Sequence, residues 1–268
     1  MVIGRIKPIH KPFTCHKIRF SGRKGKTFLN ITIVFYFHGK KRMNLLLVAA
    51  TPYEIAPTLR YLAENFSQIH PNTWQKADLQ VSSLVTGVGS IATAWHLAQY
   101  LTTMPTDWAL NAGVAGAFDR TLSLGDVVQV TAEQFGDLGV EEADGGFSDL
   151  FQLGLSDPND PPFVNGVLYN PTAGQTKFLP PVQGLTVNRV HGHSVSIEAV
   201  RQSFPHAQVE SMEGAAFFYG CLSANIPFAE IRSISNYVET RNRDNWQLGL
   251  AIDNLNRVLL EILDSLKE

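Results

Sequence analysis

From residue 43 onward, short apolar runs alternate with longer amphipathic runs, and this alternation constrains the fold more than any other feature. NLLLVAA (44–50) and LQVSSLVTG (79–87) have the length and continuous apolarity of buried strands. Helices are expected between such runs, at 53–65 and 90–101 among others. Strand–helix alternation favours a parallel sheet covered on both faces. Residues 43–268 are therefore predicted to form a single α/β domain with a central mixed, largely parallel sheet flanked by helices.

The remaining elements follow the same pattern, with one interruption. Further strands are expected at 107–118, 125–132, 184–190 and 227–238, and further helices at 211–224 and 245–266. The glycines of NAGVAGAF (111–118) are expected to turn the end of their strand into a loop. Residues 141–182 hold six of the 14 prolines. We interpret them as a long excursion near a binding site, with room for a short helix.

Basic charge is concentrated at the start of the chain. Residues 1–42 hold eleven of the 22 Lys and Arg residues and no Asp or Glu. The segment is upstream sequence or an appendage before a native start at Met43, a targeting segment, or a functional basic arm. Its apolar run FLNITIVFYF (28–37) is too short to span a membrane. We favour the first interpretation, which predicts neither nucleic-acid nor membrane binding and leaves 43–268 as the folded domain.

Cysteine, histidine and glycine spacing predicts no metal and no cofactor. Cys15 and Cys221 form no CxxC pair, and the eight histidines show no convincing ligand spacing. VTGVGS (85–90) is not a complete GxGxxG motif, and no acidic residue follows it at the distance that a nicotinamide cofactor requires. The cysteine content favours a cytoplasmic protein.

Polar and glycine-rich motifs lie at the carboxyl ends of predicted strands, where ligands bind in sheets of this kind. Glu54, in TPYE (51–54), can hold or deprotonate a water, or act only as a first-turn helix acid. Gly87, in VTGVGS, either exposes backbone N–H groups to an anion or sugar hydroxyl, or forms a tight turn. The small residues of NAGVAGAF allow a flat ligand close to the backbone, or close packing of a bend.

Two further motifs carry acidic or basic side chains. VESMEGAA (209–216) places Glu210 and Glu213 in an apolar run, where acids are rare unless partnered. A carboxylate there can clamp the vicinal hydroxyls of a ribose. RSISNYVETRNRDNW (232–246) ends a strand in Ser-Asn and continues into an arginine-rich loop, which is either part of a site or a plain connection.

Together, the order and spacing of these motifs resemble the purine nucleoside phosphorylase / methylthioadenosine nucleosidase superfamily. The resemblance covers the chain from Met43 onward. It implies cleavage of the N-glycosidic bond of a purine nucleoside. Phosphorylases of the superfamily carry an arginine-based phosphate site near the first strand and the glycine loop. No arginine stands in 48–59 or 85–95, which favours water as the nucleophile.

The resemblance also implies roles for individual residues. Glu54 occupies the place of the glutamate that activates water in the nucleosidases. Met212 and Glu213 match the pair that packs under the ribose and binds its hydroxyls. The further substrate-binding residues implied are Gly87, Ala115, Gly116, Val190, His191 and Ser235, with the purine edge at Ala115 and Gly116.

Asn236 stands where adenine-specific nucleosidases carry an aspartate that acts as an acid toward purine N7. Its amide can donate to a 6-oxo group and accept from a protonated N7, so we expect a 6-oxopurine such as hypoxanthine. The details most resemble nucleosidases whose substrate carries an acidic 5′ extension, and Arg241 and Arg243 are candidate partners for that charge, or simply solvated arginines. The partner expected is thus a small-molecule nucleoside, bound by a homo-oligomer of dimer size or larger.

Four alternatives stay open. The first is a methylthioadenosine/adenosylhomocysteine nucleosidase, and the second is an inosine phosphorylase. The third is a storage-type relative without catalysis, and the fourth is a nucleic-acid binder that works through its basic segment. The asparagine at 236 opposes the first, and the retained Glu54 and Glu213 oppose the third.

Overall fold

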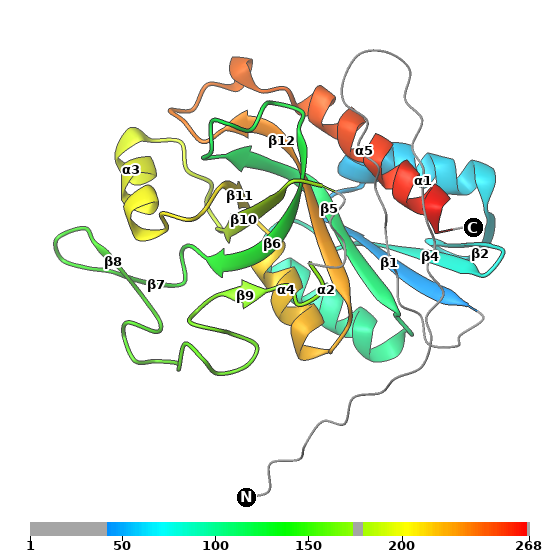
Figure 1. The fold of residues 1–268 in the computed structure, drawn as a ribbon, viewed down its shortest axis with the longest axis horizontal. Helices are drawn as coiled ribbons and strands as arrows, with labels where there is room; N and C mark the ends of the chain where they lie inside the picture. The colour runs from blue at the N-terminus through cyan, green and yellow to red at the C-terminus, as the bar shows by residue number, and fades with distance from the viewer. Residues whose placement is uncertain (1–41, 174–178, 267–268) are drawn as a thin grey trace, which may run out of the picture.

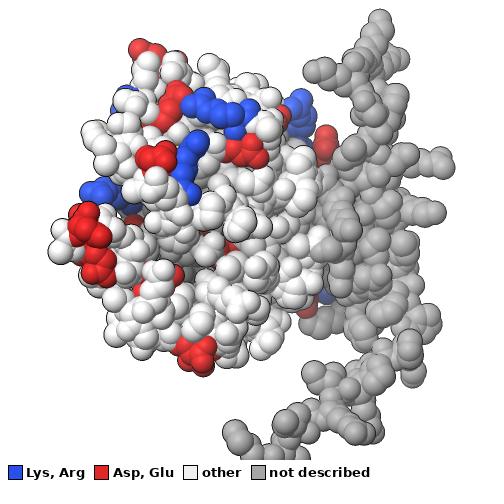
Figure 2. Space-filling view, turned by 60° about the vertical axis from the view of Figure 1, so that its left-hand side comes forward, with Lys and Arg blue, Asp and Glu red and all other residues white. Residues whose placement is uncertain are grey.

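The computed structural model describes residues 42–173 and 179–266. Our expectations for residues 1–42 therefore lie outside the described residues, apart from Arg42. Within the described part of the chain, no helix is both long and apolar enough to cross a membrane. On the face shown in Figure 2, basic and acidic side chains lie close together, and the described residues form no continuous basic surface there.

A mixed sheet forms the centre of the domain (Figure 1). Its principal strands are β1 (Met43–Ala49), β4 (Leu79–Val85), β5 (Trp108–Ala117), β6 (Val127–Phe135), β10 (Pro181–Thr186), β11 (Val209–Ser211) and β12 (Phe228–Tyr237). β4, β1, β5 and β12 are parallel neighbours, so their carboxyl ends meet at one edge. This confirms the predicted fold class.

Part of the sheet closes on itself. β12 pairs with β6 in the antiparallel sense. β6 pairs with β10, and β10 with β11, both in the parallel sense. β11 then pairs antiparallel with the end of β5, at Val209↔Ala117 and Glu210↔Gly116. β5, β12, β6, β10 and β11 therefore form a ring, and β11 reaches the carboxyl end of β5 from the side opposite β12.

Helices cover both faces of the sheet. α1 (Pro52–Asn65) and α5 (Leu248–Ser265) lie together on one face, and α2 (Ser90–Thr103) and α4 (Gly214–Ser223) on the other (Figure 1). β1 serves both layers because successive side chains of a strand point to opposite faces. Leu45 and Leu47 pack in the core that contains α1 and α5, whereas Leu46 and Val48 pack in the core that contains α4. This explains the unbroken apolar run of β1.

Shorter elements complete the fold. These are the hairpin strands β2 (Ser67–His70) and β3 (Thr73–Lys76) beside β4, the pair β7 (Gly139–Glu141) and β8 (Phe147–Asp149), β9 (Leu168–Tyr169) beside β6, helix α3 (Ser194–Ser203), and the 3₁₀ turn Arg243–Asn245. β8 and β9 lie in the proline-rich excursion, and β7 ends at its first residue. The described residues of 141–182 contain no α-helix.

Two predictions about strands were wrong in detail. NAGVAGAF does not break into a loop: Gly113 and Gly116 both pair with β12 within β5, before and after a bulge in β12. The strand predicted at 184–190 runs instead over Pro181–Thr186. Residues 187–190 leave the sheet there and lead toward α3, and Val187 packs in the core around α3 instead of taking a ladder position.

Candidate active site

Glu54 lies at the start of α1, directly after the carboxyl end of β1. Its Oε2 accepts hydrogen bonds from the backbone N–H and the hydroxyl of Thr51, both at 2.9 Å. Its Oε1 accepts from the backbone N–H of Val114 in β5 at 3.2 Å. Glu54 therefore caps α1, as the alternative interpretation expects, and also reaches across to the neighbouring strand end. Both carboxylate oxygens are held, so the side chain has a fixed position in the site.

The backbone of Glu54 is supported from α5. Pro57 lies inside α1 and has no N–H to donate to the Tyr53 carbonyl. The Asn256 amide bridges two backbone groups of the same helix: its Nδ2 donates to the Glu54 carbonyl at 2.8 Å, and its Oδ1 accepts from the Thr58 N–H at 3.1 Å. Asn256 is buried. A side chain of α5 thus supports the backbone of Glu54 beside the proline of α1.

Glu213 is held by the glycine turn before α2. The backbone N–H of Gly89 donates to Glu213 Oε1 at 3.0 Å, and the Ser90 hydroxyl donates to the Met212 carbonyl at 3.4 Å. Gly89 has φ +95°, a conformation that favours glycine. Burial raises the pKa of the Glu213 carboxyl, although the charge of Arg232 and the Gly89 N–H oppose this rise.

Arg232 lies close enough to both glutamates to feel their charges. This residue lies in the middle of β12, and only 1 % of its surface is exposed. Its Nε donates to Glu230 Oε1 at 2.9 Å. A Cβ placed on Gly113 would overlap Arg232 Nη1 and would lie 2.9 Å from Glu54 Oε1, so both side chains extend over this glycine. Gly113 therefore leaves the space in which the guanidinium and the Glu54 carboxylate meet.

Carboxylates surround this guanidinium. Burial alone would lower the pKa of Arg232, but the charges of Glu230, Glu213, Glu54 and Glu133 outweigh burial and raise that pKa. A buried cation needs such partners, since an unpaired charge in the interior is very unfavourable. Arg232 stays charged between the two site glutamates.

A second pair of carboxyl groups lies beneath the site. Glu133 and Glu230 are fully buried on adjacent strands, and Glu133 Oε2 accepts from the Thr186 hydroxyl at 2.8 Å. Burial and then the neighbouring Glu230 charge raise the pKa of Glu133 well above its ordinary value. Burial also raises the pKa of Glu230, against the opposing charge of Arg232. The pair therefore retains a proton more readily than exposed glutamates do.

A small pocket opens beside these groups at the end of β5. It is lined by Gly116, Val190, His191, Glu210, Asn236, Tyr237, Glu239, Arg241, Asn242 and Trp246. Asn236 pairs with Gly116 from β12, after a bulge at Ser235, and Glu210 pairs with Gly116 from β11. A Cβ on Gly116 would lie 3.1 Å from Asn236 Nδ2, so the glycine keeps the floor of the pocket open.

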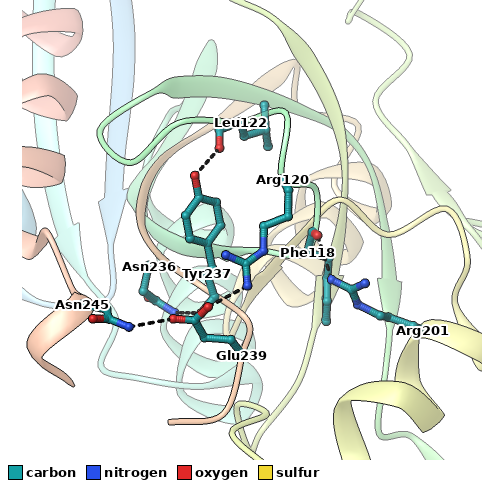
Figure 3. A network of polar contacts seen from close by, with 8 residues as sticks. All are labelled: Phe118, Arg120, Leu122, Arg201, Asn236, Tyr237, Glu239 and Asn245. Atoms are coloured by element: carbon teal, nitrogen blue, oxygen red, sulfur yellow. Dashed lines mark hydrogen bonds and ion pairs between the residues drawn. The ribbon is translucent and has the colours of Figure 1, made fainter. Parts of the chain in front are cut away.

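The amide of Asn236 has a defined orientation. The Ser235 hydroxyl donates to Asn236 Oδ1 at 2.8 Å. Asn236 Nδ2 donates to the Tyr237 carbonyl at 3.0 Å (Figure 3). The Tyr237 hydroxyl in turn donates to the Leu122 carbonyl at 3.0 Å. These bonds fix which end of the amide is oxygen and which is nitrogen.

An ion pair closes the wall of the pocket beyond Tyr237. Arg120 Nη2 lies 2.6 Å from Glu239 Oε2, and its guanidinium stands 4.2 Å from the centre of the Tyr237 ring (Figure 3). Asn245 Nδ2 donates to Glu239 Oε1 at 3.0 Å. The Arg120–Glu239 pair therefore links the loop after β12 to the loop after β5.

Most of the predicted site residues come together at this edge of the sheet. Glu54 and Glu213 meet around Arg232, with Gly87 in the turn that leads to Gly89 and Met212 beside Ser90. Val190, His191, Asn236 and Arg241 line the pocket with Gly116, and Ala115 and Ser235 adjoin it. Arg243 lies exposed in the 3₁₀ turn, outside the lining of this pocket.

Sequence reasoning missed several residues of the assembly: Gly89, Glu133, Glu230, Arg232 and Asn256. One signal was present for three of them. Charged residues within the apolar runs FAEIRSI and VTAEQF must be partnered when those strands are buried. The role of Asn256 has no such local signal.

Comparison with known proteins identifies the family of the chain. The family model of the phosphorylase superfamily matches residues 44–264. A futalosine hydrolase of Thermus thermophilus is 32 % identical over 67 % of this chain and 80 % of its own length. A 5′-methylthioadenosine/S-adenosylhomocysteine nucleosidase of Psychromonas ingrahamii is 28 % identical over 70 % of this chain and 82 % of its own length.

The fold is also that of solved relatives. The native structure of the futalosine hydrolase of Helicobacter pylori superimposes with a TM-score of 0.67 at 16 % identity, and covers 83 % of this chain and 97 % of that one. The chain belongs to the phosphorylase superfamily, together with these futalosine hydrolases and nucleosidases.

Proposed function

We propose that this chain hydrolyses the N-glycosidic bond of futalosine and releases hypoxanthine, as a step of menaquinone biosynthesis. Futalosine is an inosine-type nucleoside with a carboxyphenyl ketone extension at its 5′ side. The observation that carries the proposal is that Asn236, an amide in a fixed orientation, lines the pocket beside the Glu54–Arg232–Glu213 group. The proposed site thus combines Glu54, which would activate water, and Glu213, which would bind the ribose, with Asn236, an amide suited to a 6-oxopurine.

The reaction follows from these side chains. Cleavage of C1′–N9 leaves positive charge on the ribose and moves the bonding electron pair onto the purine. Glu213 accepts hydrogen bonds from the ribose hydroxyls and orients the sugar. Glu54 takes a proton from the water that attacks C1′. Asn236 stabilises the departing hypoxanthine by donating to O6, and the base takes up a proton from solvent.

Arg241 is the proposed partner of the 5′ carboxylate. It lies at the mouth of the pocket, with its guanidinium 5.2 Å from the centre of the Trp246 ring. A cation beside an aromatic face suits an aryl carboxylate, because the ring can stack while the guanidinium pairs with the charge. Arg243 lies farther out and is the weaker candidate.

Substrate comparison tests the function directly. The protein is incubated with futalosine, inosine or methylthioadenosine, with and without phosphate, and free base is followed by chromatography. We expect hypoxanthine from futalosine at a rate indifferent to phosphate. Adenine release from methylthioadenosine at a comparable rate would contradict the proposal, and a strict phosphate requirement would indicate a phosphorylase. Glu54→Gln is expected to lose about 10²–10⁴-fold in rate.

We also propose that the protein is a homo-oligomer of dimer size or larger. Apolar side chains at the start of α2 lie open to solvent: Val88 is 55 %, Ile91 85 % and Trp95 62 % exposed. Such a group of neighbouring apolar side chains favours contact with another protein surface. Light scattering of the wild type and of Ile91→Asp tests this; a monomeric wild type would contradict the proposal.

A further inference from the structure

Glu210 lies across the pocket from Asn236. Both residues are register partners of Gly116, Glu210 on β11 and Asn236 on β12. Residues paired across neighbouring strands project to the same face, and two strand spacings amount to about 10 Å. Because Gly116 has no side chain, the space between the carboxyl and the amide stays open, and all three residues line the pocket. A flat ligand in this pocket would therefore have the Glu210 carboxyl on one side and the Asn236 amide on the other.

His191 fixes the Glu210 carboxyl in this position. The backbone N–H of His191 donates to Glu210 Oε1 at 3.0 Å, and His191 Nδ1 makes a short hydrogen bond to Glu210 Oε2. Glu210 is buried, with a side chain only 3 % exposed. Each carboxylate oxygen can accept more than one hydrogen bond, so capacity remains on the pocket side. The carboxyl is thus a buried acceptor held by one neighbouring residue.

The two common purines differ at the edge that these groups face. In hypoxanthine, N1 carries a hydrogen and O6 accepts; in adenine, N1 is a bare acceptor and the 6-amino group donates. Given the proposed function, Asn236 donates a hydrogen bond to O6, and the protein then needs an acceptor for the N1–H. We propose that Glu210 accepts the N1–H of the 6-oxopurine and is, with Asn236, a specificity-determining residue of the reaction.

The magnitude follows from the chemistry of the acceptor. A hydrogen bond to a charged group of this kind corresponds to about 10- to 100-fold in affinity. With adenine, the carboxylate would face the N1 lone pair and remain unpaired toward the base. Sites built around such hydrogen bonds reject the mismatched ligand strongly. Discrimination between the two bases is therefore expected to depend on Glu210.

The test compares futalosine with its 6-amino analogue. We expect Glu210→Gln, which removes the charge and keeps the shape, to lower the ratio of the two kcat/KM values by about 10- to 100-fold. Glu198→Gln, on an exposed position of α3, is the matched control and should leave the ratio unchanged. A general loss of activity in Glu210→Gln with the wild-type ratio retained would overturn the inference.

A second measurement needs no variant. Hypoxanthine, 1-methylhypoxanthine and 2-methylhypoxanthine compete as inhibitors of the wild type; only the 1-methyl compound lacks the N1–H. Inhibition weakened at least about tenfold by 1-methylation, but not by 2-methylation, is the expected result, and equal inhibition by all three would refute the role of Glu210. Failure of the proposed function is seen separately, because the wild type would then not release hypoxanthine from futalosine.

Discussion

Replacement of Glu133 by glutamine is expected to change how the stability of the fold depends on pH. The Glu133 carboxyl is sealed between backbones: a Cβ on either Gly184 or Gly214 would overlap its Oε1. Burial, followed by the charge of Glu230, raises the pKa of Glu133 well above its ordinary value. The native state therefore keeps a proton at pH values where the unfolded chain has already released it.

The sign of the effect follows from proton linkage. Where the native state binds one proton more than the unfolded state, the free energy of unfolding falls by about 1.4 kcal/mol for each pH unit. This stabilisation is complete below the ordinary glutamate pKa and is lost as pH rises toward the raised one. The glutamine side chain of the variant cannot titrate, yet its amide can still donate to Glu230 and accept from Thr186. The wild type should thus lose stability relative to the variant as pH rises above the ordinary glutamate pKa, by no more than about 1.4 kcal/mol for each pH unit.

Urea denaturation at about pH 5.5, 6.5 and 7.5, followed by tryptophan fluorescence, measures this difference. Glu64→Gln, at an exposed position of α1, serves as the control and should follow the wild type at every pH. Parallel pH profiles for the wild type and Glu133→Gln would refute the reasoning, because they would mean that Glu133 carries no extra proton in the native state.

Three further changes test the site. Gly113→Ala places a Cβ against Arg232 and Glu54; we expect kcat/KM for base release to fall at least about 100-fold with an unchanged circular dichroism spectrum, and activity close to that of the wild type would contradict the geometry. Asn256→Ala removes the buried amide that bonds the Glu54 carbonyl and the Thr58 N–H, which should lower the free energy of unfolding by about 2–3 kcal/mol in urea titrations. Asn236→Asp should shift the kcat/KM preference toward 6-amino nucleosides, and an unchanged preference would remove Asn236 from base selection.

The fold could be predicted from sequence where its elements have a local signal. The buried strand at 44–50 and the closing helix at 245–266 are close to β1 and α5, because continuous apolarity and helical spacing are properties of a few neighbouring residues. β11 could not be predicted in the same way. It has three residues, and its pairing with both β10 and the end of β5 depends on chain far away in sequence.

The same distinction separates the predicted side chains of the site from the missed ones. Glu54 and Glu213 follow strand ends, and parallel strands bring such ends together. Arg232 stands out as a charge within the apolar run of β12, but all of its carboxylate partners except Glu230 come from other segments of the chain. Asn256 acts on α1 from α5, at a sequence separation of 202 residues. Neither interaction can be derived from spacing within one motif.

The charge balance around Arg232 supports water as the nucleophile. One guanidinium faces the carboxyl groups of Glu54, Glu213, Glu230 and Glu133, so its charge is already offset within the protein. A phosphate ion entering beside Glu54 and Glu213 would meet two carboxylates, and the guanidinium beside them is already neutralised by these carboxylates. Removing the phosphate ion from water into this place would therefore be unfavourable. A neutral water does not meet this repulsion. In the proposed reaction the same carboxylates would favour the positive charge that develops on the ribose as C1′–N9 breaks, so the arrangement that disfavours phosphorolysis would lower the barrier to hydrolysis.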